Sequence, residues 1–224
     1  MNKRKLLLKS ISVGIMALVI FNLSLFLPAG SIYYWNAWIF NIVTFVPLIS
    51  FVIYMFQKDP KLLERRLNIK EKEKEQKILQ LLGIVEFLAL FVLPGFDFRF
   101  HWSSVPLPIV ILSNIGYLLG YLFIIRVFIE NSFASRIIQV EKNQKVISTG
   151  PYAYIRHPMY LGVLIMYFFM PIALGSFYGM LAFIFLPVHI VQRIRNEEKV
   201  LEKELPGYKE YKEKVKFKLI PQLW

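Results

Sequence analysis

Two short stretches, TGPYAYIRHPMYLG at Thr149–Gly162 and RIRNEEKVL at Arg193–Leu201, place ionisable and hydrogen-bonding side chains beside long apolar runs. Those runs, on either side of the stretches, are apolar enough to enter a bilayer. Polar groups at such a border are costly unless they bind something. We therefore interpret the two stretches as halves of one site, and the rest of the chain as a membrane scaffold that brings them together.

The composition predicts a lipid-embedded protein. Of the 224 residues, 56% are hydrophobic and 16% are aromatic, which is far richer in apolar side chains than a soluble domain. The net charge is +12, but the basic residues interrupt apolar runs instead of forming one solvated face, so we expect anionic lipid headgroups and no nucleic acid as partners. The absence of cysteine excludes disulfides, thiolate metal sites and cysteine nucleophiles, and three histidines predict no histidine-rich metal centre.

Four apolar runs are predicted to cross a hydrocarbon core of roughly 30 Å as helices. Aromatic residues suited to the membrane interface introduce the second run, and Pro94-Gly95 is expected to stop the third. A cleaved signal peptide is the alternative for the first run, which ends in small residues. The runs are Leu6–Pro28, Trp35–Phe56, Ile78–Leu93 and Pro106–Phe128.

Two further apolar stretches, Pro158–Ile172 and Phe177–Val191, are short for independent spans and predict a tight, shallow helical hairpin. From Gln192 the chain is expected to be helical and charged. The predicted fold is therefore an all-α integral membrane protein with four full transmembrane helices, a short C-terminal helical hairpin and a charged cytoplasmic helical tail. We expect a single domain over 1–224, made of two spans (1–56), a cytoplasmic connector (57–77), two more spans (78–128) and a cofactor-binding and catalytic part (129–224).

Charge asymmetry predicts the orientation in the membrane. Of the 27 lysines and arginines, all but Arg99 fall in segments that share one side if the N-terminus is inside. The positive-inside rule then places both termini and both polar stretches on the cytoplasmic side. Within the connector, Asp59-Pro60 is the predicted start of a short helix, and Lys70–Lys77 is expected to be solvated.

Polar residues within the spans have two interpretations. A carboxyl such as Glu86 in the middle of a span is a functional hypothesis, but a protonated Glu bonded to a neighbouring helix is the interpretation that we prefer. Asn22, Asn41 and Asn114 are expected to form hydrogen bonds between helices.

The first polar stretch predicts an anion site at the start of a helix. Gly150-Pro151 makes a turn and Pro158 begins a helix, so Arg156 and His157 lie at a helix N-terminus, where unpaired N–H groups and the helix dipole favour a carboxylate or phosphate. Three nearby tyrosines add aromatic faces, which predicts a pocket for a planar ring with an anionic group. They are Tyr152, Tyr154 and Tyr160.

On the second stretch, Arg193 and Glu197 are four residues apart and share a helical face, whereas Glu198 points about 100° away, so the two carboxylates are expected to have separate roles. One role is to bind a ligand ammonium, and the other is to hold the fold together. The simpler alternatives are a snorkelling cation beside a helix start and an isolated i,i+4 ion pair. Because both stretches lie at the ends of one short hairpin, we prefer a joint site.

These motifs resemble the isoprenylcysteine carboxyl methyltransferase family, in its prokaryotic form, and the related phospholipid N-methyltransferases. The resemblance covers about 58–224. It implies an integral membrane enzyme that binds S-adenosylmethionine at the cytoplasmic side and takes a lipophilic acceptor from the bilayer. The motifs are Gly150-Pro151-Tyr152, Arg156-His157-Pro158-Met159-Tyr160, Gly162, Arg193, Glu197-Glu198, Leu201, Gly207, Tyr208 and Tyr211.

Roles carried over by this resemblance make Glu197 the cofactor-binding acid and Arg193 the catalytic, acceptor-contacting arginine. Gln144 stands where eukaryotic members often have histidine. This difference argues against the eukaryotic methyl acceptor for this chain more than it argues against the cofactor. Supporting roles go to Gly150, Arg156 and Glu198, and no metal is implied. The cofactor-contacting stretch corresponds to Gln144, Lys145, Val146, Ile147, Tyr152, His157, Pro158, Met159 and Tyr160.

The expected function is methyl transfer from S-adenosylmethionine to the carboxylate of an isoprenoid-type or prenylcysteine-like substrate. A carboxylate is already a nucleophile at neutral pH, so orientation and desolvation suffice and no general base is needed. A quinone-like ring and an aminophospholipid are also compatible acceptors. Two alternatives stay open: an NADPH-dependent reductase of the membrane sterol reductase type, which has a related Arg-His-Pro motif, and a non-catalytic lipid-binding protein.

Overall fold

The computed structural model describes residues 2–67, 74–134, 140–141 and 143–224, with no side-chain description for 74–80. The described part is helical and contains no strand, so the predicted all-α fold is confirmed. The helices are α1 (Lys3–Ala29), α2 (Trp35–Lys58), α3 (Pro60–Arg66), α4 (Lys74–Phe100), α5 (Leu107–Glu130), η1 (a 3₁₀ turn, Gly150–Ala153), α6 (Pro158–Ala173), α7 (Met180–Phe183), α8 (Leu186–Glu204) and α9 (Tyr208–Lys214).

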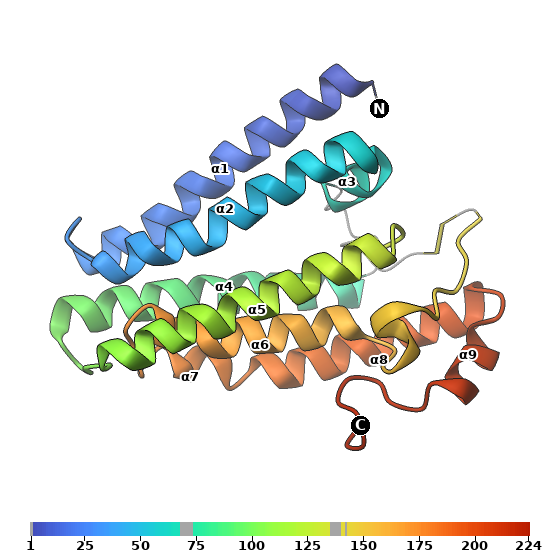
Figure 1. Ribbon diagram of the computed structural model, residues 1–224. Coiled ribbons are helices and arrows are strands. Elements are labelled where there is room, and N and C mark those ends of the chain that lie inside the picture. The colour runs from blue at the N-terminus through green and yellow to red at the C-terminus, as the bar shows by residue number, and fades with distance from the viewer. Residues whose placement is uncertain (1, 68–73, 135–139, 142) are drawn as a thin grey trace.

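Within the described residues, four helices are long and apolar enough to cross a membrane, namely α1, α2, α5 and the Leu81–Phe100 part of α4. These helices correspond to the four predicted spans, and the protein is an integral multi-pass membrane protein. Figure 1 shows α4, α5, α6 and α8 running alongside one another, with α9 and the C-terminus at one end of this layer. The α5–α6 and α1–α4 pairs pack most extensively. The two polar stretches therefore lie at one end of the bundle.

The predicted stop at Pro94-Gly95 is wrong, because α4 continues to Phe100. The structure shows a packing reason for this glycine. A Cβ atom at position 95 would lie 2.7 Å from the carbonyl oxygen of Leu25 and 2.9 Å from Cβ of Pro28. Gly95 thus allows α4 to approach the backbone of α1, as small residues do between membrane helices.

The predicted hairpin is confirmed in its first arm, α6, and differs in its second. That arm is divided into the single turn α7 and the long helix α8, which begins at Leu186 with Pro187 in its first turn. Proline is tolerated there because the first N–H groups of a helix have no partner within it. α8 then continues without a break into the charged sequence as far as Glu204, so one helix carries both apolar and ionic residues.

The predicted helix start in the connector and one of the three predicted asparagine bonds between helices are confirmed. Asp59 caps α3 as expected, its Oδ1 accepting from the N–H of Leu62 at 3.0 Å. Asn114 of α5 donates to the carbonyl of Ala173 on α6 at 3.5 Å. Asn22 and Asn41, however, donate to carbonyls four residues back on their own helices, so their predicted bonds between helices are wrong. The side chains of the charge run Lys70–Lys77 lie outside the described residues.

Close packing of α5 on α6 leads to a prediction for Gly162. A Cβ atom there would lie 2.4 Å from Cγ1 of Ile124, so Gly162→Ala is expected to destabilise the fold by about 1–3 kcal/mol. The matched control is Gly14→Ala on α1, where a Cβ meets nothing within 4 Å and helix propensity favours alanine. Thermal unfolding in detergent measures both. Equal melting temperatures for the two variants would contradict this packing.

Candidate active site

A C-terminal segment covers the start of α6. The N–H of Arg156 donates to the carbonyl of Phe217 at 3.0 Å, and the N–H of His157 donates to the carbonyl of Lys218 at 2.9 Å. The anion site was predicted at the unpaired N–H groups of the first turn of the helix, which begins at Pro158, and these two residues lie just before that turn. Their donors are satisfied by the chain itself, which returns to α6 from about 60 residues away.

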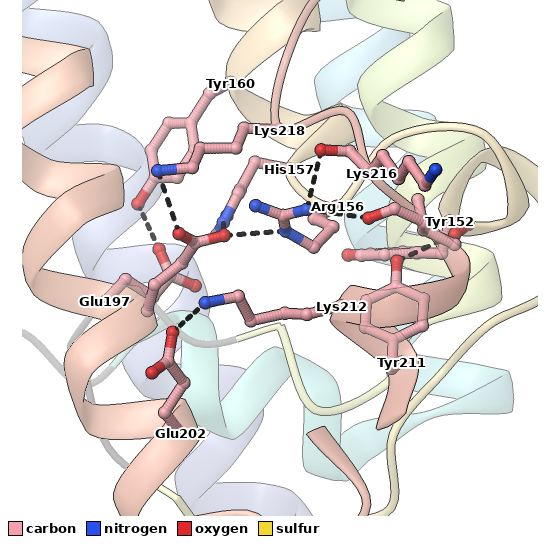
Figure 2. Close-up of polar contacts among 12 residues, drawn as sticks. Tyr152, Arg156, His157, Tyr160, Glu197, Glu202, Tyr211, Lys212, Lys216 and Lys218 are labelled. Carbon is pink, nitrogen blue, oxygen red and sulfur yellow. Dashed lines mark hydrogen bonds and ion pairs between the residues drawn. The ribbon is translucent and has the colours of Figure 1, made fainter. Parts of the chain in front are cut away.

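Arg156 and Glu198 form a buried ion pair at this point. Arg156 Nε lies 2.7 Å from Glu198 Oε1, and its Nη1 donates to the carbonyls of Val215 at 2.7 Å and Lys216 at 2.9 Å. Both side chains of the pair are at least 94% buried. Figure 2 shows the guanidinium between α8 and the C-terminal segment. Arg156 therefore joins three parts of the chain and is held within the protein.

Two more side chains approach the same carboxylate. His157 Nε2 lies 3.4 Å from Glu198 Oε1, and Lys218 Nζ lies 3.2 Å from Oε2. Burial raises the pKa of Glu198, but hydrogen bonds from His157 and Arg156 outweigh burial and hold the pKa well below its ordinary value. Glu198 is thus a structural anion that fixes the start of α6 to α8.

Glu197, the next residue, faces a different set of partners. Its Oε2 accepts a hydrogen bond from the hydroxyl of Tyr160 at 2.7 Å, and the same hydroxyl accepts from Arg193 Nε at 3.0 Å. Figure 2 shows Tyr160 and Glu197 to the left of Arg156. The tyrosine hydroxyl thus connects the acid of α8 to the arginine one turn earlier.

A polar cavity lies between η1, the start of α6, α8 and α9. It brings together all ten residues predicted to contact a cofactor, and Arg156 also lines it. Gly150 and Glu198 do not line it, and Tyr154 is 73% exposed, so the prediction that Tyr154 belongs to the pocket is wrong. The lining residues are Asn131, Phe133, Ala134, Gln144, Lys145, Val146, Ile147, Tyr152, Arg156, His157, Pro158, Met159, Tyr160, Glu197, Leu201, Leu205, Tyr208 and Tyr211.

Seven of these lining residues were not predicted as site residues. Tyr208 and Tyr211 belong to the quoted motif, and their position after the Leu205-Pro206-Gly207 break was the available signal for them. Tyr211 supports the site by donating from its hydroxyl to the carbonyl of Tyr152 at 2.7 Å. Burial raises the pKa of Tyr152 to about 12, so its hydroxyl stays protonated at neutral pH. The other five are Asn131, Phe133, Ala134, Leu201 and Leu205.

An apolar cavity of about 310 Å³ lies on the other side of Tyr160, between α4, α6 and α8. Arg193 lines this apolar cavity and does not line the polar cavity, whereas Glu197 lines only the polar one. Tyr160 is common to both. The lining residues are Gly83, Ile84, Phe87, Tyr160, Val163, Tyr167, Leu186, His189, Ile190 and Arg193.

The sequence that forms these two cavities was compared with known protein families. Residues 110–203 match the sequence model of the isoprenylcysteine carboxyl methyltransferase family. This match supports membership of that family and, with it, the general function of a membrane methyltransferase. No curated protein matches the chain.

The family match contains both polar stretches and most of the two cavities. It runs from α5 through η1, α6 and α7 to Lys203, near the end of α8. The C-terminal segment that pairs with Arg156 and His157 lies beyond it, as do α1, α2 and the part of α4 that lines the apolar cavity. The lining of the two cavities is thus completed from outside the match, by part of α4 on one side and by Leu205 and α9 on the other.

Proposed function

We propose that the chain transfers the methyl group of S-adenosylmethionine to the carboxylate of a lipophilic acceptor of the isoprenoid-type or prenylcysteine-like class. The cofactor would bind in the polar cavity and the acceptor in the apolar cavity. With the termini inside, as the charge distribution predicts, the polar cavity opens to the cytoplasm, where the cofactor is found. The acceptor then reaches its cavity from the bilayer.

The observation that carries this proposal is the Tyr160 hydroxyl. It contacts Glu197 in the polar cavity and Arg193 in the apolar cavity, so the two spaces meet at one side chain. Methyl transfer needs a charged, water-soluble donor and a lipophilic acceptor to meet in line. A polar and an apolar cavity that share a wall satisfy this requirement.

The polar cavity has groups that fit S-adenosylmethionine. The Glu197 carboxylate is suited to the cofactor's ammonium. The Tyr208 hydroxyl is buried with no hydrogen-bond partner among the described residues, which points to a ligand. Lys145–Ile147 pass along the cavity outside any helix, and their backbone groups form no hydrogen bond to other described residues, so they are available to an adenine edge.

The residues of this chain would act by binding and orientation. When bound, S-adenosylmethionine supplies a methyl group on a sulfonium, which is electrophilic without further activation. Arg193 binds the acceptor carboxylate, and Tyr160 holds Arg193 in position. The apolar lining excludes water, which strengthens the contact between guanidinium and carboxylate. Because the acceptor is already anionic, no proton needs to be removed.

Calorimetric titration of the detergent-purified protein with S-adenosylmethionine tests the cofactor. We expect saturable binding that Glu197→Ala weakens about ten- to a hundredfold, because the ligand ammonium loses a charged partner. The matched control is Glu202→Ala on the same helix, whose ion pair with Lys212 lies outside the polar cavity. Equal affinity of Glu197→Ala and the parent would exclude this role for Glu197.

A parallel titration with NADPH separates the methyltransferase from a reductase. We expect no saturable NADPH binding. If NADPH binds and S-adenosylmethionine does not, the proposed cofactor is wrong. If folded protein binds neither, the non-catalytic lipid-binding alternative is favoured.

A further inference from the structure

A third cavity, of about 630 Å³, lies between the α1–α2 pair and the helices α4, α5 and α6. Figure 1 shows α1 and α2 as a separate layer, in which α1 approaches α4 near Ala29 and diverges from it toward the N-terminus. We call this space the interlayer cavity. Tyr160 and Arg193 do not line it, and the described residues that it shares with the apolar cavity are Phe87 and Tyr167. It is therefore separate from the candidate active site.

The interlayer cavity is elongated along α1. Lys9 and Ser24 both line it and are 15 residues apart on this helix, which corresponds to about 22 Å at the rise of an α-helix. The hydrocarbon core of a bilayer is roughly 30 Å thick. With the N-terminus inside, as the charge distribution predicts, Lys9 marks the cytoplasmic end and Ser24 the opposite end. The cavity thus extends through most of the hydrocarbon core, in the direction that a lipid chain follows.

Beyond its cytoplasmic end, the interlayer cavity is lined mainly by apolar and aromatic side chains, among them Val13, Ile20 and Met170. Two hydroxyl groups in its outer half are paired with each other, because Thr44 donates to the Tyr117 hydroxyl at 3.2 Å. Among the described lining residues, this part of the cavity carries no charge. A hydrocarbon chain is the occupant that such a lining favours.

The cytoplasmic end of the interlayer cavity is positively charged. Lys9 of α1 and Arg66 of α3 line it, and no acidic side chain is among the described lining residues. The Arg66 guanidinium lies 4.5 Å from the ring centroid of Phe128 on α5, a cation–π contact that positions it. An ammonium and a guanidinium at the border of a hydrocarbon layer attract an anion, and a phosphate accepts hydrogen bonds from both.

Glu86, the carboxyl beside this cavity in sequence, is directed elsewhere. It precedes the lining residues Phe87 and Leu88 of α4, but its Oε2 lies 2.7 Å from Nδ1 of His189 on α8. The preferred prediction for Glu86, a bond to a neighbouring helix, is thereby confirmed. This carboxyl therefore serves the contact between α4 and α8 and does not neutralise the cations of the interlayer cavity.

We propose that the interlayer cavity binds an anionic phospholipid of the cytoplasmic leaflet. The lipid phosphate contacts Lys9 and Arg66, and an acyl chain extends along α1 toward Ser24. A zwitterionic lipid has the same phosphate, but its own ammonium competes with the two cations, so the site favours a lipid with net negative charge. The headgroup then joins α1 to α3 at the cytoplasmic border.

Native mass spectrometry of the delipidated full chain in detergent tests this site with two lipids that have identical acyl chains. We expect one dioleoyl phosphatidylglycerol per chain, bound about tenfold more tightly than dioleoyl phosphatidylcholine, since each cation adds a charge-assisted contact. Equal affinities for the two lipids would overturn the proposal. Displacement of the phospholipid by N-acetyl-S-farnesylcysteine would also overturn it, because the cavity would then hold the tail of the methyl acceptor.

Paired variants separate the cavity from general surface charge. Lys9→Gln together with Arg66→Gln is expected to remove the preference for phosphatidylglycerol. The matched control is Lys5→Gln together with Lys61→Gln, which removes the same charge from the same two helices. Both control residues are exposed and line none of the three cavities, so the preference should remain. Equal loss in the two double variants contradicts the proposal, since surface charge alone would then hold the lipid, and so does a preference that survives in both.

A second pair of variants tests the position of the acyl chain. Ala17 lines the interlayer cavity, so Ala17→Phe is expected to fill it and to weaken the binding of both phospholipids about tenfold. Leu18→Phe is the control, because Leu18 is exposed and does not line the cavity. Unchanged lipid affinity in Ala17→Phe would place the lipid outside the cavity and overturn the proposal. Thermal unfolding in detergent checks that each variant is folded.

This experiment is independent of the cofactor test. The interlayer cavity and the polar cavity share no described lining residue. If the lipid shows no preference while S-adenosylmethionine binds, the lipid site is wrong and the methyl donor stands. If the preference follows the variants but S-adenosylmethionine does not bind, the lipid site stands and the proposed reaction fails.

Discussion

Arg193→Ala is expected to lower methyl transfer by about a hundredfold to a thousandfold, with S-adenosylmethionine affinity unchanged. Such losses are typical when an enzyme loses one charged group that orients or stabilises the reacting atoms. The split between turnover and cofactor binding is expected because Arg193 lines the apolar cavity and not the polar one. Transfer of a tritiated methyl group to N-acetyl-S-farnesylcysteine, extracted into organic solvent, measures the rate, and calorimetry measures the affinity.

Two controls sharpen this result. Arg195→Ala removes a cation two residues away that is exposed and lines neither cavity, so it should keep the parent rate. Arg193→Lys should recover only part of the activity, because an ammonium cannot bind a carboxylate through two parallel hydrogen bonds. If Arg193→Ala retains the parent rate, or loses S-adenosylmethionine binding together with activity, its assignment to the acceptor is wrong.

Arg156→Ala is expected to have the largest effect on stability, about 3–5 kcal/mol. The substitution leaves the buried Glu198 without its main partner and removes the donors to the Val215 and Lys216 carbonyls. The C-terminal segment should then separate from the start of α6. Thermal unfolding in detergent measures the loss of stability, and protease sensitivity after Leu205 reports the release of the segment.

The control for this variant is Arg126→Ala. Arg126 is half-exposed in its pair with Glu130, where solvent screens the charges, so its removal should leave the melting temperature close to that of the parent. The double variant Arg156→Met/Glu198→Met should recover much of the stability, because apolar residues of similar size replace a buried ion pair at little cost. A fully stable Arg156→Ala protein would show that the pair does not hold the segment.

Local features of the sequence predicted the helices well. The four spans follow from runs of apolar residues, and the start of α3 follows from Asp59-Pro60, because hydrophobic length and helix capping depend on residues that are neighbours in sequence. The same reasoning failed at Pro94-Gly95. A turn and a helix-packing contact can use the same two residues, and only the approach of α1 distinguishes them.

The sequence predicted which residues line the candidate site, but it did not predict which of them contact one another. Ten predicted residues line the polar cavity, yet no pattern in the sequence indicated that Tyr160 contacts both Glu197 and Arg193. Nor did it indicate that Phe217 and Lys218 would occupy the N–H groups at the start of α6. Glu86 was noted as an unusual carboxyl, but its partner His189 lies on a helix 103 residues away.

The sequence by itself determined the class of protein, the membrane helices and the family resemblance, because each depends on composition, periodicity or residues close together in the chain. Only the tertiary structure decided which ionic groups are held within the fold and which line a cavity. Glu197 and Glu198 are adjacent in sequence, yet one faces the polar cavity and the other is buried against Arg156. That difference arises because a helix turns neighbouring side chains about 100° apart, and packing against α6 and the C-terminal segment then gives each a different environment.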